Sequence, residues 1–221
     1  MLATDSTTSN LLEQLVKDRI LHLDGGMGTM LQRHKPTEKD WRGEQFANHS
    51  TDLTNCSDVL NLTQPDWIRD IHTQYLEAGA DIIETNSFLG TRIGLADNAL
   101  QDYARETNLA AARLAREAVD AMNKKTPDKP RFVAGSIGPL NKFLSIGTDE
   151  ENPALRKVTF DQVVETYYEQ ISTLVEGGVD ILLAETAIDT ANLKACLFAA
   201  EKFFEDSGQA LPLMASLSFL N

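Results

Sequence analysis

Asp24 and the glycines that follow it, Gly25, Gly26 and Gly28, are the residues of this sequence with the clearest chemical meaning. An apolar run beginning at Ile20 ends in the Asp24 carboxylate, and the glycines then leave the backbone open to close approach by a ligand. This pattern predicts a buried strand that carries Asp24 at its C-terminal end. The structural alternative is a tight glycine turn in which Asp24 only caps the next helix.

Glu185 is a second carboxylate at the end of a predicted strand. Asp24 and Glu185 could together bind an ammonium group, while backbone N–H groups at Gly25, Gly26 and Met27 could bind a carboxylate, which would suit the two ends of an α-amino acid. Two carboxylates could instead be a general acid and base, as in a glycosidase, or both could cap helices. Further candidate pocket residues at predicted strand ends are Met27, Thr85, Asn86, Ser136 and Asn141.

Five strands are predicted to position these side chains. They cover residues 20–24, 82–86, 131–136, 181–185 and 212–219, with helices predicted at about 11–18, from Pro65 onward, and at about 100–122, 159–176 and 189–206. Within a strand, neighbouring residues point to opposite sides, so Glu84, Thr85 and Asn86 are not all expected in one pocket.

The segment Glu77–Asn86 is echoed by Glu176–Glu185. Each copy contains the end of a helix, a glycine suited to a left-handed cap, an aspartate, and a strand that ends in polar residues. Strands that alternate with helices predict a parallel sheet, either an open doubly wound sheet or a (β/α)8 barrel. Polar residues at the end of every strand favour the α/β barrel of the TIM type, here truncated after about five strands. The segment 31–64 is predicted to be an ordered cover.

The composition excludes several classes of protein. The net charge of −13, with no cluster of Lys or Arg, argues against a nucleic acid or an anionic membrane as the main partner. Cys56 and Cys196 are far apart in the sequence and form no metal-ligand motif, so they fit a reducing cytoplasm better than a disulfide framework. No signal peptide and no apolar stretch of membrane-spanning length is visible.

Several motifs of the sequence resemble the homocysteine-binding domain of cobalamin-dependent methionine synthase. In order along the chain they are LDGGMGTMLQ (23–32), WRGEQF (41–46), NLTQPD (61–66), AGADIIETNSF (78–88), RFVAGSIGPLNK (131–142) and GGVDILLAETAIDTANLKA (177–195). The resemblance covers about Arg19 to Leu213. It implies a tail and leading helix over residues 1–18 and a barrel domain over 19–221 that is incomplete at its C-terminus.

The resemblance implies methyl transfer from methylcobalamin to homocysteine, giving methionine, with homocysteine bound as a thiolate on zinc. It also implies cobalamin-binding and folate-binding modules as partners. The substrate contacts that it assigns match Asp24, the backbone at Gly25 and Gly26, Thr85 and Glu185.

In the family, three cysteines hold the zinc, and none of them has a counterpart before Asn221. No catalytic or metal-binding residue is therefore assigned, and the chain alone is expected to be inactive. The alternatives are a catalytically inactive amino-acid-binding module, or an unrelated lyase or aldolase-type barrel that uses Asp24 and Glu185 as acid and base.

Overall fold

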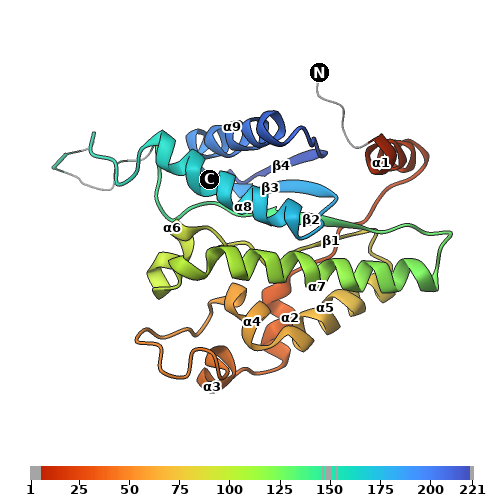
Figure 1. Cartoon of the computed structure of the whole chain (residues 1–221), viewed down its shortest axis with the longest axis horizontal. Helices are drawn as coiled ribbons and strands as arrows, with labels where there is room; N and C mark the ends of the chain where they lie inside the picture. The colour runs from red at the N-terminus through yellow and green to blue at the C-terminus, as the bar shows by residue number, and fades with distance from the viewer. Residues whose placement is uncertain (1–5, 146, 148–150, 153, 220–221) are drawn as a thin grey trace.

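The computed structural model describes residues 6–145, 147, 151–152 and 154–219 (Figure 1). The four strands are β1 (Ile82–Glu84), β2 (Phe132–Ile137), β3 (Ile181–Ala187) and β4 (Leu213–Leu217). The α-helices are α1 (Ser6–Asp18), α2 (Met27–Arg33), α3 (Glu38–Arg42), α4 (Leu60–Thr63), α5 (Pro65–Ala78), α6 (Arg92–Leu95), α7 (Ala104–Lys125), α8 (Phe160–Glu176) and α9 (Thr190–Ser207). Short 3₁₀ helices are η1 (Ser57–Val59), η2 (Ala96–Asn98) and η3 (Gln101–Tyr103).

The strands form one parallel sheet in the order β1-β2-β3-β4, so each strand lies beside the next strand in the chain. A doubly wound sheet would reverse its strand order at a switch point, and no reversal occurs among the described strands. Helices α5, α7, α8 and α9 lie side by side in chain order (Figure 1). This succession is that of part of a (β/α)8 barrel, as the sequence predicts.

The two faces of the sheet carry different apolar clusters. Residues such as Ile83, Val133 and Leu182 pack against the helices in the main core. Their strand neighbours Ile82, Phe132 and Ile181 belong to a smaller cluster on the opposite face. This opposite face corresponds to the interior of a barrel, and we call it the inner face. Successive strand residues point alternately to the outer and the inner face, and both faces carry apolar clusters. The sequence of each strand is therefore a nearly continuous run of apolar residues.

The first predicted strand, residues 20–24, is reduced to a single bridge between Leu23 and Ile82. The segment runs parallel to β1, and the Asp24 N–H donates to the Ile82 carbonyl at 2.9 Å. The prediction that it is a buried strand was wrong, because Ile20 is 78% exposed and Leu23 is 40% exposed. No described strand covers its other edge, and the glycines after Asp24 end the extended conformation.

Two aspartates, the buried Asp81 and the half-buried Asp180, show that the echo in the sequence is a repeated structural unit. Each aspartate follows a glycine of positive φ, Gly79 at 113° and Gly178 at 96°. Asp81 accepts the His22 N–H at 3.0 Å and binds Arg19, while Asp180 accepts the Val133 N–H at 2.8 Å and binds Arg116. Each aspartate thus fixes the start of its own strand to the preceding extended segment.

The segment 31–64 folds into a compact cover, as expected from its buried-type residues. Trp41, Phe46 and Leu53 are buried in a second core cluster with residues of α5 and α7. At the N-terminus, α1 begins at Ser6, earlier than the predicted start at residue 11, and its Leu12 and Leu15 pack against the inner-face cluster. The part of the predicted tail before Ser6 lies outside the described residues.

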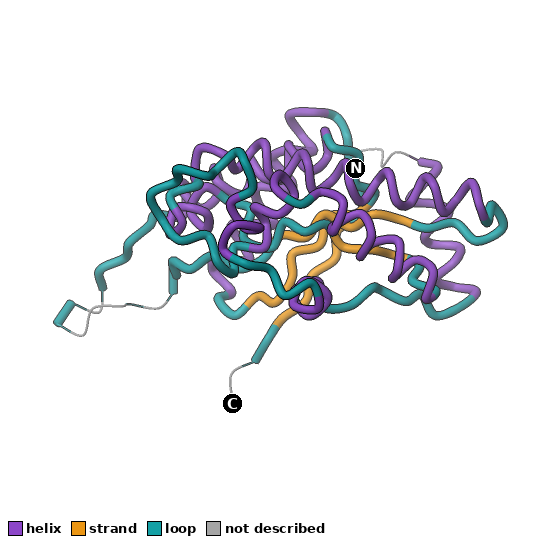
Figure 2. The backbone as a smooth tube through the Cα atoms, turned by 90° about the horizontal axis from the view of Figure 1, so that it is seen from below, coloured by secondary structure: helices purple, strands orange, loops and turns teal. Residues whose placement is uncertain are grey.

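The last described residues after the edge strand β4 run to the periphery of the molecule (Figure 2). Its Leu217 is 46% exposed. None of the described helices has a stretch long and apolar enough to cross a lipid bilayer.

Candidate functional site

A cavity of about 430 Å³ lies at the carboxyl ends of β1, β2 and β3. It brings together eight of the nine residues predicted for the site, which are Asp24, Gly25, Gly26, Met27, Thr85, Asn86, Ser136 and Glu185. Gly28, Ser57, Glu84 and Phe88 complete the lining. The ninth residue, Asn141, does not line the cavity, which corrects the prediction. The Nδ2 of its exposed side chain instead donates to Asp97 Oδ2 at 2.6 Å.

Glu84, Ser136 and Glu185 extend the inner face beyond its apolar cluster. Glu84 follows Ile82 at the strand period of two, and Glu185 likewise follows Ile181 and Leu183. The Ser136 hydroxyl donates to the Glu185 Oε1 at 2.5 Å and holds that carboxylate at the wall of the cavity.

A β-bulge follows Glu185 directly. Between the Ala184–Ala215 and Ala187–Leu217 pairs, β3 contains one residue more than β4. Thr186 lies at this extra position and has a φ of 55°, which is uncommon for a β-branched residue. Its N–H donates to the Ser216 hydroxyl at 2.9 Å. Backbone strain therefore lies next to a carboxylate of the cavity, as is frequent at functional sites.

Asp24 reaches the cavity from the segment beside β1. Its Oδ2 accepts the Glu84 N–H at 3.1 Å, while its Oδ1 is buried and has no hydrogen-bond partner among the described residues. Burial raises the pKa of Asp24 to about 7, and the Glu185 charge adds to this increase. An unsatisfied buried carboxylate oxygen is costly, so a donor from a ligand would be favoured at this position.

Glu84 is a residue that the predicted site set missed. Burial raises its pKa to about 8, with additional repulsion from Glu185 and Asp24. The strand-end sequence Glu84-Thr85-Asn86 was the available signal, but alternation argued against placing all three residues in one pocket. Because β1 ends at Glu84, the strand period does not apply to Thr85 and Asn86, and all three residues line the cavity.

Thr85 and Asn86 use their side chains to support the wall. The Thr85 hydroxyl lies 2.6 Å from the Ser87 hydroxyl and accepts the Ser136 N–H at 2.9 Å. The Asn86 Nδ2 donates to the Ser57 carbonyl at 2.8 Å and to the Asn61 Oδ1 at 3.1 Å. These bonds hold neighbouring parts of the cavity wall in fixed positions.

The backbone from Gly25 to Met27 forms the wall nearest Asp24. A side chain at Gly25 would place its Cβ 3.1 Å from the hydroxyl of Tyr75, so the close approach of α5 favours glycine at this position. The Tyr75 hydroxyl donates to the Gly26 carbonyl at 3.3 Å. Helix α2 begins at Met27, and the first N–H groups of a helix have no acceptor within the helix.

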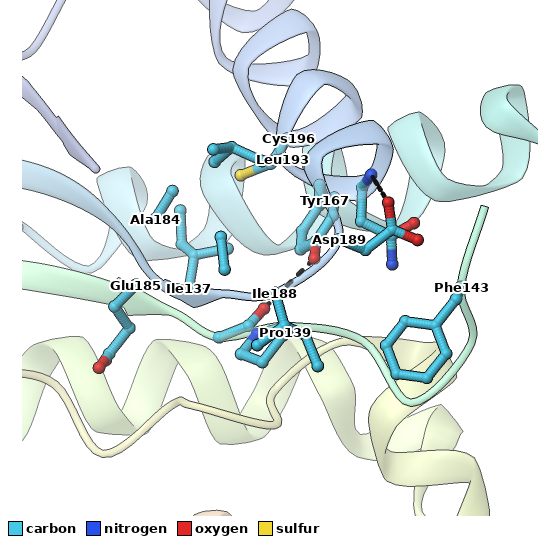
Figure 3. Close-up of a pocket in the computed structure, with 13 residues that line it drawn as sticks. Ile137, Pro139, Phe143, Tyr167, Ala184, Glu185, Ile188, Asp189, Leu193 and Cys196 are labelled. Atoms are coloured by element: carbon cyan, nitrogen blue, oxygen red, sulfur yellow. Dashed lines mark hydrogen bonds between the residues drawn. The ribbon is translucent and has the colours of Figure 1, made fainter. Parts of the chain in front are cut away.

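A second void on the other side of Glu185 is too small for an amino acid, at about 10 Å³. Figure 3 shows its mixed lining, with the apolar Cys196 and Leu193 from α9, with Asp189, and with the Tyr167 hydroxyl donating to the Gly138 carbonyl at 3.3 Å. The Glu185 carboxylate points away from Cys196 and Leu193 (Figure 3). The cavity of about 430 Å³, which Asp24, Glu84 and Glu185 all line, is the candidate ligand site.

Comparison with known proteins identifies the family of the chain. Residues 21–221 match the family model for homocysteine S-methyltransferase. The chain belongs to the homocysteine S-methyltransferase family. The fold is also similar to that of the homocysteine methyltransferase MmuM from Escherichia coli. The metallated form has 25% sequence identity and a TM-score of 0.68, and the oxidized form has 25% and 0.69. The alignments cover 95% and 94% of this chain, and the chain spans 65% of the length of either structure.

The zinc that the sequence resemblance implies does not fit the residues present in this part of the homocysteine S-methyltransferase fold. No group of three His, Cys, Asp or Glu residues among the described residues could hold a metal ion. Cys56 and Cys196 are both buried, and burial raises the pKa of each thiol to about 12, which disfavours the thiolate that zinc requires.

Proposed function

We propose that this chain binds homocysteine by its amino-acid end in the cavity at the carboxyl edge of the sheet. The observation that supports this function is the set of three carboxylates, Asp24, Glu84 and Glu185, around a cavity whose described lining contains no Lys or Arg. Such a cavity favours a ligand that brings its own positive charge. Membership of the homocysteine S-methyltransferase family supports homocysteine as that ligand.

Each end of the amino acid has a group to receive it. The ammonium would donate to Asp24 Oδ1, which is buried without a partner among the described residues, and to Glu185. The carboxylate would accept from backbone N–H groups in the segment Gly25–Met27. Thr85 would hold Ser136, which in turn holds Glu185, so its role in binding would be indirect.

We infer that the enzyme is a methionine synthase, with methylcobalamin as methyl donor and with cobalamin-binding and folate-binding modules as partners in the cytoplasm. The motifs WRGEQF and NLTQPD support this assignment over relatives that use other methyl donors. The described residues do not supply the zinc ligands, so their proposed contribution is to bind and orient the substrate.

A second candidate function is that of an amino-acid-binding module without catalysis. It is supported by the three carboxylates of the cavity, which would bind an amino acid whether or not methyl transfer follows. Acid–base chemistry by Asp24 and Glu185 is a third candidate, because an Asp24 pKa of about 7 would suit a general base. Methyl transfer from methylcobalamin to homocysteine would distinguish the first candidate from the other two.

Isothermal titration calorimetry of the chain with L-homocysteine, in the presence of a non-thiol reductant, tests the binding proposal. Asp24→Asn and Glu185→Gln should each weaken binding by roughly 10- to 150-fold, which corresponds to about 1.5–3 kcal/mol for a hydrogen bond to a charged group. Glu201→Gln removes an exposed carboxylate on α9 and serves as the control. Unchanged affinity in both cavity variants would refute the assignment of the ammonium site.

A further inference from the structure

The carboxylate of Glu84 has no hydrogen bond or ion pair with any residue that the structure describes, although the side chain is only partly exposed. Its backbone N–H is bound by Asp24, so the two acidic residues are held close together by the chain itself. Glu185 acts electrostatically on both of them from β3. A partly buried carboxylate without a partner, beside two others, has no evident structural purpose.

We propose that Glu84 is a third ammonium-facing carboxylate that determines specificity for a free amino group, and that the incoming ammonium displaces a proton from the Asp24–Glu84–Glu185 cluster. This inference rests on the proposed binding of an amino acid in the same cavity.

Repulsion among the three carboxylates explains why an ammonium would replace a proton. Three carboxylates in one partly buried cavity cannot all be ionised at low cost, so the empty cluster retains a proton near neutral pH. The pKa values of about 7 for Asp24 and about 8 for Glu84 are consistent with this. An ammonium supplies the missing positive charge, so the cluster ionises and the proton passes to the solvent. The ammonium itself keeps its three protons, and no covalent bond changes.

The other groups around the cluster do not replace the ammonium. Burial raises the pKa of Tyr75 from α5 and the charge of Asp24 adds to this increase, so the Tyr75 hydroxyl stays neutral. Arg33 at the end of α2 acts on Tyr75, but it does not line the cavity. β2 contributes Ser136 and the start of η1 contributes Ser57, neither of which titrates. The compensating charge must therefore come from the ligand.

Calorimetric titration of the full chain with L-homocysteine in phosphate and in Tris measures the number of protons released, because these buffers differ in ionisation enthalpy. The range pH 5.5–7.5 is suitable because the ligand thiol, with a pKa of about 8.5, remains largely protonated. Release of one proton for each bound ligand makes the affinity rise by about tenfold for each pH unit. The wild-type chain should approach this slope between pH 6 and 7.

Glu84→Gln should reduce the proton release by about half or more and flatten the pH slope, while Glu201→Gln should leave both unchanged. The ratio of affinities for L-homocysteine and 4-sulfanylbutanoate, which lacks the amino group, should fall by about tenfold in Glu84→Gln. Urea unfolding of each variant checks that the fold is retained, and Glu84→Asp should restore part of the proton release.

Two failures can be told apart. If the wild-type chain binds L-homocysteine but Glu84→Gln has the same proton release and the same discrimination as the wild type, the role of Glu84 is refuted and the binding proposal stands. If the wild-type chain binds neither L-homocysteine nor 4-sulfanylbutanoate, the proposed function itself fails.

Discussion

Replacing Asp81 by Asn should destabilise the protein and loosen the segment that carries Asp24. The Asp81 side chain is 1% exposed and accepts two hydrogen bonds from Arg19, at 2.8 and 2.9 Å, with Lys129 3.4 Å away. Burial alone would raise the pKa of Asp81, but the bonds from Arg19 and from the His22 N–H hold it at about 2, against an ordinary value of 3.8. This difference corresponds to about 2.5 kcal/mol of stabilisation by the ionised form.

The sign of the pH dependence follows from the lowered pKa. The stabilisation by Asp81 is fully present above the unfolded value near 4, and it is lost as the pH falls from about 4 to about 2. Urea unfolding at pH 7 should therefore give a free energy of unfolding about 2.5 kcal/mol lower in Asp81→Asn, or a melting temperature lower by about 5–10 °C. The difference from wild type should shrink as the pH approaches 2.

Asp180→Asn is the matched control, because Asp180 occupies the equivalent place in the second copy of the repeat. Burial raises the pKa of Asp180 despite its contact with Arg116, so its ionised form is less favoured in the folded chain than in the unfolded chain. The control should lose less than about 1 kcal/mol. Equal losses in the two variants, or a loss in Asp81→Asn that does not depend on pH, would refute the electrostatic argument.

Two further predictions concern the buried thiols and the packing beside the site. Cys56 and Cys196 should react with a thiol reagent only after unfolding, because burial raises the pKa of each thiol to about 12. Elemental analysis of the purified chain should find no stoichiometric zinc. One tightly held zinc per chain would contradict the prediction about zinc. Gly138→Ala should cost about 1–3 kcal/mol in urea unfolding, because its Cβ would lie 2.4 Å from the Phe88 carbonyl oxygen, whereas Gly28→Ala, with nothing within 4 Å, should be neutral or stabilising by up to about 1 kcal/mol.

The sequence was sufficient to predict the elements that local patterns determine. Helices α8 and α9 and strands β2 and β3 lie within a few residues of their predicted positions, because periodicity, capping residues and glycines mark their ends. The same patterns could not show that the segment 20–24 forms only one bridge. That outcome depends on which strands lie beside the segment, and on how soon Gly25 ends its extended conformation.

The errors at the site have a similar origin. Asn141 was placed near the pocket because it follows β2 closely, but its partner Asp97 is 44 residues away in the sequence, and no local pattern indicates that contact. Glu84 is absent from the expected site because the resemblance assigns its neighbour Thr85 as the substrate contact at this strand end. Alternation along a strand over 82–86 would place Glu84 on the same side as Asn86, so the strand period alone gives no reason to leave Glu84 out.

The two copies of the repeat supply carboxylates at different positions along their strands. In the echo of the sequence, Glu84 aligns with Leu183, an inner-face core residue, whereas Glu185 aligns with Asn86. In the first copy, β1 ends at Glu84, which takes the inward-facing place that Leu183 has in the second copy. In the second copy, β3 continues to a further inward-facing residue, Glu185, before the bulge at Thr186. The two side chains therefore line the cavity from different levels of the sheet, and Asp81 and Asp180 fix the start of each strand to the segment beside it.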